Sequence, residues 1–160
     1  MQTTTQFLRF TLAGRHYAFD VHKTREVLPL VKITPLPDSL TFLSGVIALR
    51  GGLIPVVDLR RRLALPEAET PDTAIIILEV RTDQGTAAVG VIVDSVQGVS
   101  DHASEDLEPA PKFGLSIDSA LILALAKSGR DLIVLLDTDK VVSGGGPLER
   151  SEVTTPKALS

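Results

Sequence analysis

Short runs of apolar or alternating apolar and polar residues, separated by turn-forming residues, occur along most of this chain. Alternation is typical of a half-buried strand, and a short apolar run between turns is typical of a buried one. Four pairs of such runs lie at residues 7–12 and 16–20, 45–49 and 53–57, 74–81 and 87–93, and 121–125 and 132–136. Each pair predicts an antiparallel hairpin, so we expect a mainly β chain.

An aspartate precedes each segment that the pattern predicts to be helical. Asp20 stands before residues 21–28, in which apolar and β-branched side chains recur at helical spacing. Asp58, Asp94 and Asp137 each end a predicted strand and begin a predicted helical turn. An aspartate at the N-cap accepts a hydrogen bond from a free backbone N–H group and stabilises the helix by about 1 kcal/mol. We interpret these aspartates as helix caps and not as a catalytic set of carboxylates.

The two halves of the chain resemble each other. Residues 53–58 (Leu-Ile-Pro-Val-Val-Asp) align with residues 132–137 (Leu-Ile-Val-Leu-Leu-Asp), and each run follows Ala-Leu and a Gly-containing turn. No helical stretch between strands is long enough for a parallel crossover, which favours small barrels. We expect one domain over residues 7–143, made of two barrels at about 7–65 and 74–143 that share an apolar seam.

Composition narrows the class of protein. Hydrophobic residues make up 44% of the 160 residues and aromatic residues only 4%, so Val, Ile, Leu and Ala must form the core. The formal net charge of −4 argues against nucleic-acid binding. The chain has no cysteine and no apolar run long enough to span a bilayer, so we expect a cytoplasmic protein without disulfides, thiolate metal sites or membrane insertion. Residues 1–6 and 144–160 are predicted to be disordered tails.

No pattern of residues in the chain is typical of catalysis. The three histidines, His16, His22 and His102, lack metal-ligand spacing, and there is no Gly-x-Ser-x-Gly elbow or phosphate-binding loop. We therefore expect a protein that is not an enzyme, binds no cofactor or metal, and acts through surfaces that dock other proteins. A small-molecule-binding or hydrolytic barrel is the alternative from another class, and it requires convergent polar groups in a pocket.

Arginines flank the predicted strand at residues 53–57. Arg50 lies in a hairpin turn, where arginine is normally solvated, but Glu26 could approach it and form a bidentate ion pair. Residues 60–62, Arg-Arg-Arg, predict the solvated face of a short helix, with an electrostatic contact to an acidic partner as the alternative.

Several motifs follow one another in a fixed order. They are Phe10-Thr-Leu-Ala-Gly14, Tyr17-Ala-Phe-Asp-Val21, Arg25-Glu-Val27, Val46-Ile-Ala-Leu-Arg-Gly51, Ile54-Pro-Val-Val-Asp-Leu-Arg60, Val89-Gly-Val-Ile-Val-Asp-Ser-Val96 and Glu108-Pro-Ala-Pro-Lys-Phe113. In this order they resemble the CheW family of chemotaxis coupling proteins over about residues 7–143. The resemblance implies two SH3-like five-stranded β-barrels around a shared hydrophobic core, with short helices.

The resemblance also implies a function. It implies a non-enzymatic adaptor that couples the cytoplasmic tip of methyl-accepting chemoreceptors to the regulatory domain of a CheA-type histidine kinase, recruited to receptor arrays in the cytoplasm. A paralogous scaffold for twitching motility or another non-flagellar chemosensory pathway is the alternative with the same fold.

The motifs carry the family's binding residues onto this chain. Arg50, Glu26 and Val27 correspond to receptor-binding positions, and Gly45, Val46 and Phe113 to kinase-binding positions. The chain departs from the family pattern at Ala48, where many members have Asn, and at Glu108, where some have a basic or apolar residue.

Overall fold

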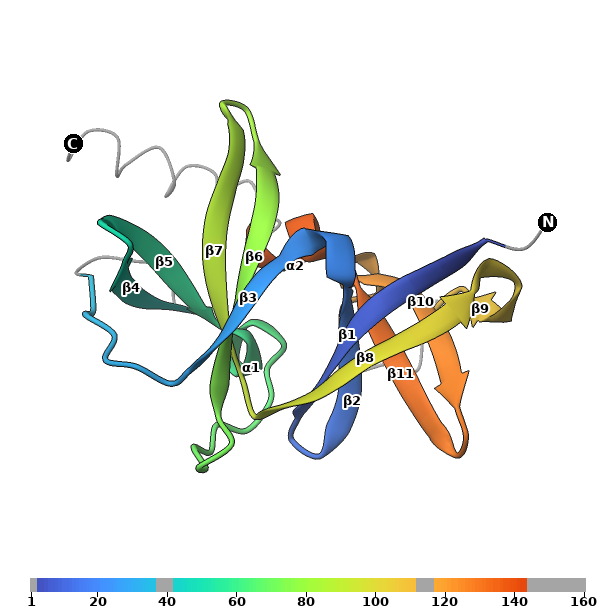
Figure 1. Cartoon of the computed structure of the whole chain (residues 1–160). Helices are drawn as coiled ribbons and strands as arrows, with labels where there is room; N and C mark the ends of the chain where they lie inside the picture. Colours follow the sequence, from blue (N-terminus) through green and yellow to red (C-terminus); the bar gives the residue numbers. More distant parts are fainter. Residues whose placement is uncertain (1–2, 37–41, 112–116, 144–160) are drawn as a thin grey trace.

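The computed structural model describes residues 3–36, 42–111 and 117–143, and these residues are mainly strand (Figure 1). The strands are β1 Thr4–Leu12, β2 Arg15–Asp20, β3 Thr24–Pro29, β4 Leu43–Leu49, β5 Gly52–Asp58, β6 Ala74–Thr82, β7 Gly85–Val93, β8 Ser95–Ala103, β9 Leu107–Glu108, β10 Ile122–Ser128 and β11 Asp131–Leu136. The helices are short: η1 Val21–Lys23, α1 Leu59–Arg62, η2 Ser104–Asp106, η3 Ser119–Leu121 and α2 Thr138–Ser143. The prediction of a mainly β chain with short helices is confirmed.

The strands form two sheets that lie side by side (Figure 1). Sheet A has six strands in the order β8-β1-β2-β11-β10-β9, and sheet B has five in the order β3-β6-β7-β5-β4. The four predicted hairpins are all present as β1–β2, β4–β5, β6–β7 and β10–β11.

All the strands of sheet B lie in the sequence between two groups of strands of sheet A. Sheet A contains the first two strands and the last four, whereas sheet B contains the strands between them. Each sheet is joined by one parallel pair, β2 with β11 in sheet A and β5 with β7 in sheet B. The expected division at residues 7–65 and 74–143 therefore differs from the strand pairing. An internal repeat shows that the hairpins are alike, but it carries no information about which hairpins pair with each other.

The core consists of three apolar clusters, and the largest lies between the sheets. Sheet A contributes Phe10, Leu12, Tyr17 and Phe19 to this shared cluster, and sheet B contributes Ile76, Leu78, Val91 and Val93. A second cluster lies within sheet A and a third within sheet B. Strand β6 contributes side chains to two clusters, one on each of its faces. Ile75 and Ile77 belong to the third cluster, and Ile76 and Leu78 belong to the shared one. This explains the uninterrupted apolar run at residues 74–78 of β6, and the predicted shared core is confirmed.

The predicted helix over residues 21–28 is wrong. Only Val21–Lys23 is helical, as the single 3₁₀ turn η1, and the chain continues as strand β3. Strand β3 pairs with β6, with Val27 opposite Ile76 and Leu28 opposite Ile75. Pairing with a long buried strand overrides the local helical spacing, and β-branched residues suit a strand.

Three of the four predicted aspartate caps are confirmed. The carboxylates of Asp20, Asp58 and Asp137 accept hydrogen bonds from backbone N–H groups of the turns that follow them, at 2.9–3.2 Å. Asp94 is the exception, since the chain continues after it as strand β8.

The two predicted tails have different outcomes. Strand β1 begins at Thr4, within the first predicted tail, because Thr4 pairs with Ala103 of β8. The second predicted tail, residues 144–160, lies outside the described residues.

Candidate protein-binding site

Arg50 lies in the turn of the β4–β5 hairpin and points toward strand β3. Its Nη1 atom donates to Oε1 of Glu26, and its Nη2 atom donates to Oε2 at 2.8 Å. The predicted bidentate pair is therefore present. The Arg50 side chain remains 71% exposed, whereas that of Glu26 is 25% exposed. A charged group that is fixed in position yet open to solvent is suited to contact with another molecule.

The pair changes the ionisation of both partners. The hydrogen bonds from Arg50 lower the pKa of the Glu26 carboxyl below its ordinary value of 4.5. The same hydrogen bonds raise the pKa of the Arg50 guanidinium. Both groups are therefore charged throughout the neutral range, and the pair is an ion pair there.

The Arg50–Glu26 pair joins the two edges of sheet B, β3 and β4. A second link lies further along, where the backbones of Thr34 and Val46 exchange two hydrogen bonds of 2.9 Å. This approach requires glycine at position 45, because a Cβ atom there would lie 2.1 Å from the carbonyl oxygen of Thr34. We call the region defined by Glu26, Thr34, Val46 and Arg50 the rim of sheet B.

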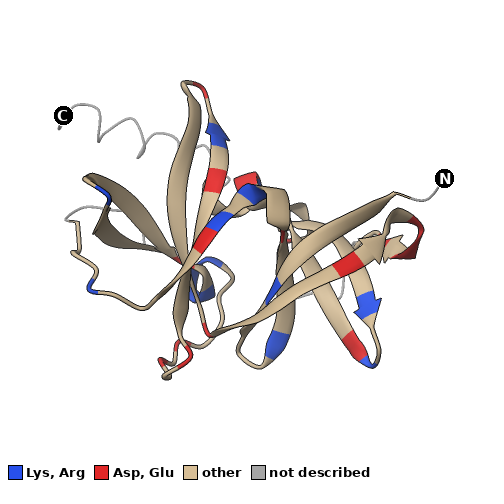
Figure 2. Cartoon of the chain, in the orientation of Figure 1, with Lys and Arg blue, Asp and Glu red and all other residues tan. Residues whose placement is uncertain are grey.

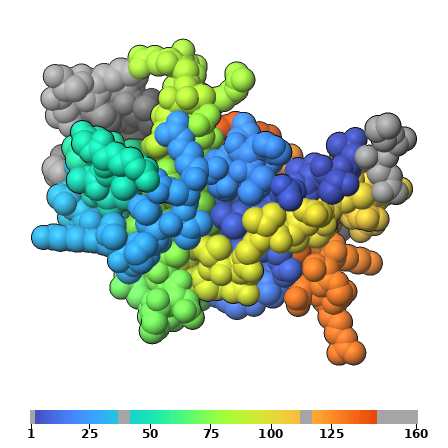
Figure 3. All heavy atoms as spheres, viewed as in Figure 1, coloured from blue at the N-terminus to red at the C-terminus, as the bar shows by residue number. Residues whose placement is uncertain are grey.

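Apolar side chains are exposed on the strands that bear the rim. Val27 follows Glu26 on β3 and is 43% exposed, and Leu53 at the start of β5 is 72% exposed. Successive side chains of a strand point to opposite faces, so Val27 and Glu26 do not share a face of β3. In the space-filling view, the β4–β5 hairpin and the segment around β3 cover neighbouring parts of one face (Figure 3).

The residues expected to contact a kinase have different environments. Gly45 is buried and Val46 is half-buried, and both lie on β4, the edge strand that carries the rim. Phe113 lies outside the described residues. The structure thus brings Glu26, Arg50 and Val46 together on one sheet. Thr34 was not among the site residues predicted from the sequence. The glycine at position 45 could have indicated that another segment of backbone approaches closely there.

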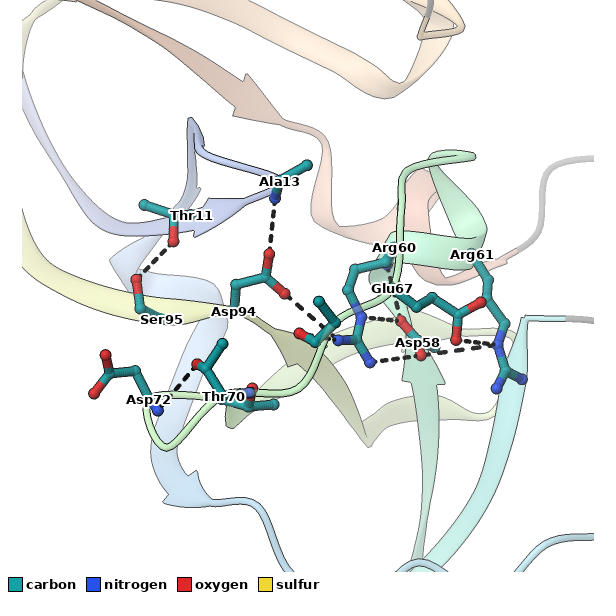
Figure 4. A network of polar contacts seen from close by, with 12 residues as sticks. Thr11, Ala13, Asp58, Arg60, Arg61, Glu67, Thr70, Asp72, Asp94 and Ser95 are labelled. Carbon is teal, nitrogen blue, oxygen red and sulfur yellow. Dashed lines mark hydrogen bonds and ion pairs between the residues drawn. The ribbon is translucent and has the colours of Figure 1, made fainter.

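Arg60 is buried, with 2% of its side chain exposed, so the predicted solvated face is wrong for this residue (Figure 4). Its Nε and Nη2 atoms donate to the two carboxylate oxygens of Asp58, each at 3.0 Å. Arg61 is 42% exposed and pairs with Glu67, in agreement with the prediction. Arg62 donates to the carbonyl oxygen of Val141. An aspartate two residues before an arginine, at the end of a buried strand, was the signal for the buried pair.

The remaining polar groups are dispersed. Figure 2 shows acidic and basic residues interspersed over both sheets, without one large region of a single sign. The three histidines have separate surroundings: His16 lies near Asp131, His22 near Asp20, and His102 is buried beside Ser100. Among the described residues, no three potential ligands gather around a common point as a metal site would need. Within that same part of the chain, none of the helices has the length and apolar character to cross a bilayer.

The described residues thus form two small β-sheets on one shared core, with a fixed charged pair exposed at the edge of one sheet. The chain belongs to the CheW-like domain family, because the model of that family matches residues 6–145.

Individual relatives agree with this membership. The chain is 33% identical to the chemotaxis protein CheW of Bacillus subtilis, over 89% of each chain. It is 29% identical to the protein FrzA of Myxococcus xanthus, over 86% of this chain and 84% of that one. The crystal structure of the scaffolding protein TtCheW from Thermoanaerobacter tengcongensis superposes with a TM-score of 0.79 and 31% identity, covering 87% of this chain and 92% of that one. By family and by fold, the chain is thus a CheW-like protein.

Proposed function

We propose that this chain couples the cytoplasmic tip of methyl-accepting chemoreceptors to the regulatory domain of a CheA-type histidine kinase and has no catalytic activity of its own. The observation that carries the proposal is the Arg50–Glu26 pair, which is bidentate, lies at an exposed sheet edge and matches the family's binding motif. The scaffold role of the relatives supports the same function.

The proposed mechanism is non-covalent. The receptor tip contacts Arg50, Glu26 and Val27, while the kinase contacts Gly45, Val46 and Phe113. A receptor conformation that binds one arrangement of the complex more tightly than another shifts the kinase between states by that difference in affinity. Recruitment to receptor arrays follows from these contacts, since the partners are themselves gathered there.

The test is an Arg50→Ala substitution assayed with the cognate receptor fragment and kinase. We expect receptor-dependent kinase activation to fall strongly while the melting temperature changes little, because an exposed ion pair contributes little to stability. Arg25→Ala is the matched control, since Arg25 forms an exposed ion pair of 2.9 Å with Glu79 on the same sheet.

Two outcomes contradict the proposal. Failure of the unaltered chain to bind either partner in a pull-down rejects the coupling function. Equal loss of activation in the Arg25 and Arg50 variants rejects the assignment of Arg50 to the receptor contact.

A second candidate keeps the fold and changes the pathway. The relative FrzA is not named as a CheW protein, so the family includes members with other designations. We infer as the alternative that this chain serves twitching motility or another non-flagellar pathway. Deletion of its gene, followed by separate assays of directed swimming in a chemical gradient and of surface motility, distinguishes the two: loss of directed swimming alone favours the first candidate, and loss of surface motility alone favours the second.

A further inference from the structure

A buried charged cluster lies where the two sheets meet, outside the rim. It contains Asp58, Arg60 and Asp94, with side-chain exposures of 2%, 2% and 19% (Figure 4). Removal of two or more charges from water costs free energy, and apolar side chains of similar size often serve stability equally well. Stability alone therefore does not explain the cluster, which points to a property that charged side chains provide and apolar packing does not.

Asp94 occupies the point where the chain leaves sheet B and enters sheet A, between the end of β7 and the start of β8. Its backbone N–H donates to the carbonyl oxygen of Thr11 at 3.0 Å, and its Oδ2 atom accepts from the N–H of Ala13 at 2.7 Å. Thr11 belongs to β1, and Ala13 to the turn that follows it. One side of Asp94 is therefore fixed to sheet A.

The other carboxylate oxygen of Asp94 faces sheet B. Oδ1 lies 3.5 Å from Nη1 of Arg60, and among the described residues it has no hydrogen-bond partner. Arg60 is itself fixed, because Asp58 binds two of its nitrogens and the carbonyl oxygen of Ala68 accepts from Nη1 at 2.9 Å. The Asp94 carboxylate thus connects the first turn of sheet A to the helix α1 that follows β5 of sheet B.

Apolar contacts and polar contacts constrain the sheets in different ways. The shared cluster keeps the sheets together, but the hydrophobic effect is non-directional and tolerates a small rotation. Hydrogen bonds depend on angle and distance, and a close ion pair depends on distance, so together they restrict rotation. On the evidence of these contacts, we propose that Arg60 and Asp94 are positioning residues that set the angle between the two sheets.

This inference extends the proposed function, on which its second part rests. The rim, with the proposed receptor contact and the proposed kinase contact at Gly45 and Val46, lies on sheet B, whereas sheet A carries exposed apolar side chains of its own, Leu123 on β10 and Leu132 on β11. An adaptor whose partners contact both sheets must present the two surfaces at one angle. Loosening the angle leaves each surface intact but misplaces one relative to the other.

The first part is tested by distance measurements between spin labels. The chain has no cysteine, so cysteines introduced at two exposed positions are labelled specifically. One pair, Thr86→Cys with Lys127→Cys, reports across the sheets, and a second pair, Thr86→Cys with Leu53→Cys, reports within sheet B.

Two substitutions loosen the connection in different ways. Asp94→Asn leaves an oxygen for Ala13 but turns an amide donor toward Arg60, and Arg60→Lys keeps the charge while losing the bidentate geometry. We expect both to broaden the distribution of distances between sheets and to leave the distribution within sheet B unchanged. Arg25→Gln, which removes an ion pair inside sheet B, should change neither. An unchanged distribution between sheets in both variants overturns the proposal, even if their melting temperatures fall.

The second part is tested with the receptor fragment and the kinase regulatory domain. We expect the Asp94→Asn chain to bind each partner alone with unaltered affinity and to lose about fivefold or more of receptor-dependent activation. Broadened distances with full activation reject the functional part and leave the geometric part standing. If the unaltered chain binds neither partner, the proposed function fails, and the spin-label result still decides the geometric part.

Discussion

Two arginines flank strand β5, and the molecule uses them in opposite ways. Arg50 precedes the strand in the hairpin turn and is 71% exposed, whereas Arg60 follows it in α1 and is 2% exposed. Both bind a carboxylate through two nitrogens. The difference lies in what surrounds the pair. Solvent screens the first pair and leaves it available to a partner, while protein encloses the second and makes the fold dependent on it.

The comparison shows that residue type and pairing do not by themselves indicate function. A bidentate arginine–carboxylate pair can be part of a binding surface or part of the interior. Burial decides between these roles, because it determines how much free energy is lost when one partner is removed.

The largest expected effect is that of Arg60→Ala. The substitution leaves the buried carboxylate of Asp58 without its partner, and we expect a loss of about 3–5 kcal/mol in the free energy of unfolding. Urea denaturation measures it. Arg61→Ala is the control, because Arg61 is 42% exposed and the loss of its side chain, which pairs with Glu67 at 3.1 Å and lies 3.8 Å from Asp58, leaves Asp58 bound to Arg60. We expect a loss of at most about 1 kcal/mol in the control. Equal losses in the two variants would remove the distinction between the buried and the exposed arginine.

The next largest effect concerns how the rim is constructed. A methyl group at position 45 would collide with the backbone of Thr34, so Gly45→Ala should lower the free energy of unfolding by about 2 kcal/mol. Gly52→Ala is the matched control in the same hairpin, since the nearest atom to its added methyl group lies 3.8 Å away. A large effect at 45 and none at 52 would show that close backbone approach, and not the Arg50–Glu26 pair alone, closes the sheet. Similar effects at both positions would contradict this.

The smallest effect is the dependence of stability on pH through Glu26. The pKa of Glu26 is lower in the folded chain than its ordinary value of 4.5, so the folded state binds this proton less readily than the unfolded state. The stabilisation is therefore fully present above pH 4.5 and is lost as the pH falls through the folded pKa.

The measurement is the difference in melting temperature between the unaltered chain and Glu26→Gln at a series of pH values. We expect a small, constant difference at neutral pH that shrinks below about pH 4.5. A difference that stays constant down to pH 3 would show that the charge of Glu26 does not contribute to the pair.

Much of the secondary structure could be predicted from local pattern. The four hairpins follow from apolar runs and turns, and the caps at Asp58 and Asp137 follow from an aspartate after a strand. Strand β3 could not be predicted from local pattern, because its residues also fit a helix and only pairing with β6 makes them a strand. The predicted helix cap at Asp94 was wrong for a similar reason, since its carboxylate contacts Ala13 and Arg60 instead of the N–H groups of a following helix.

Part of the candidate site could also be predicted. The residues alone left it undecided whether Arg50 pairs with Glu26, and the family motif favoured the pair. Pro55 has no backbone N–H group to donate within a sheet, and it lies just before the residues, Val56 to Asp58, where β5 pairs with β7. The contact of Gly45 with Thr34 and the burial of Arg60 were not predicted, because both depend on segments that come together only in the folded chain.

The hairpins, the turns, the apolar residues of the core and the family to which the chain belongs can be read from the order of residues, because they depend on residues close together or on motifs in order. The insertion of sheet B between strands of sheet A, the link between Gly45 and Thr34 at the rim and the separate environments of Arg50 and Arg60 become visible only in the folded chain. Those features depend on which strands pair across the chain and which charges lose their water, and local pattern encodes neither.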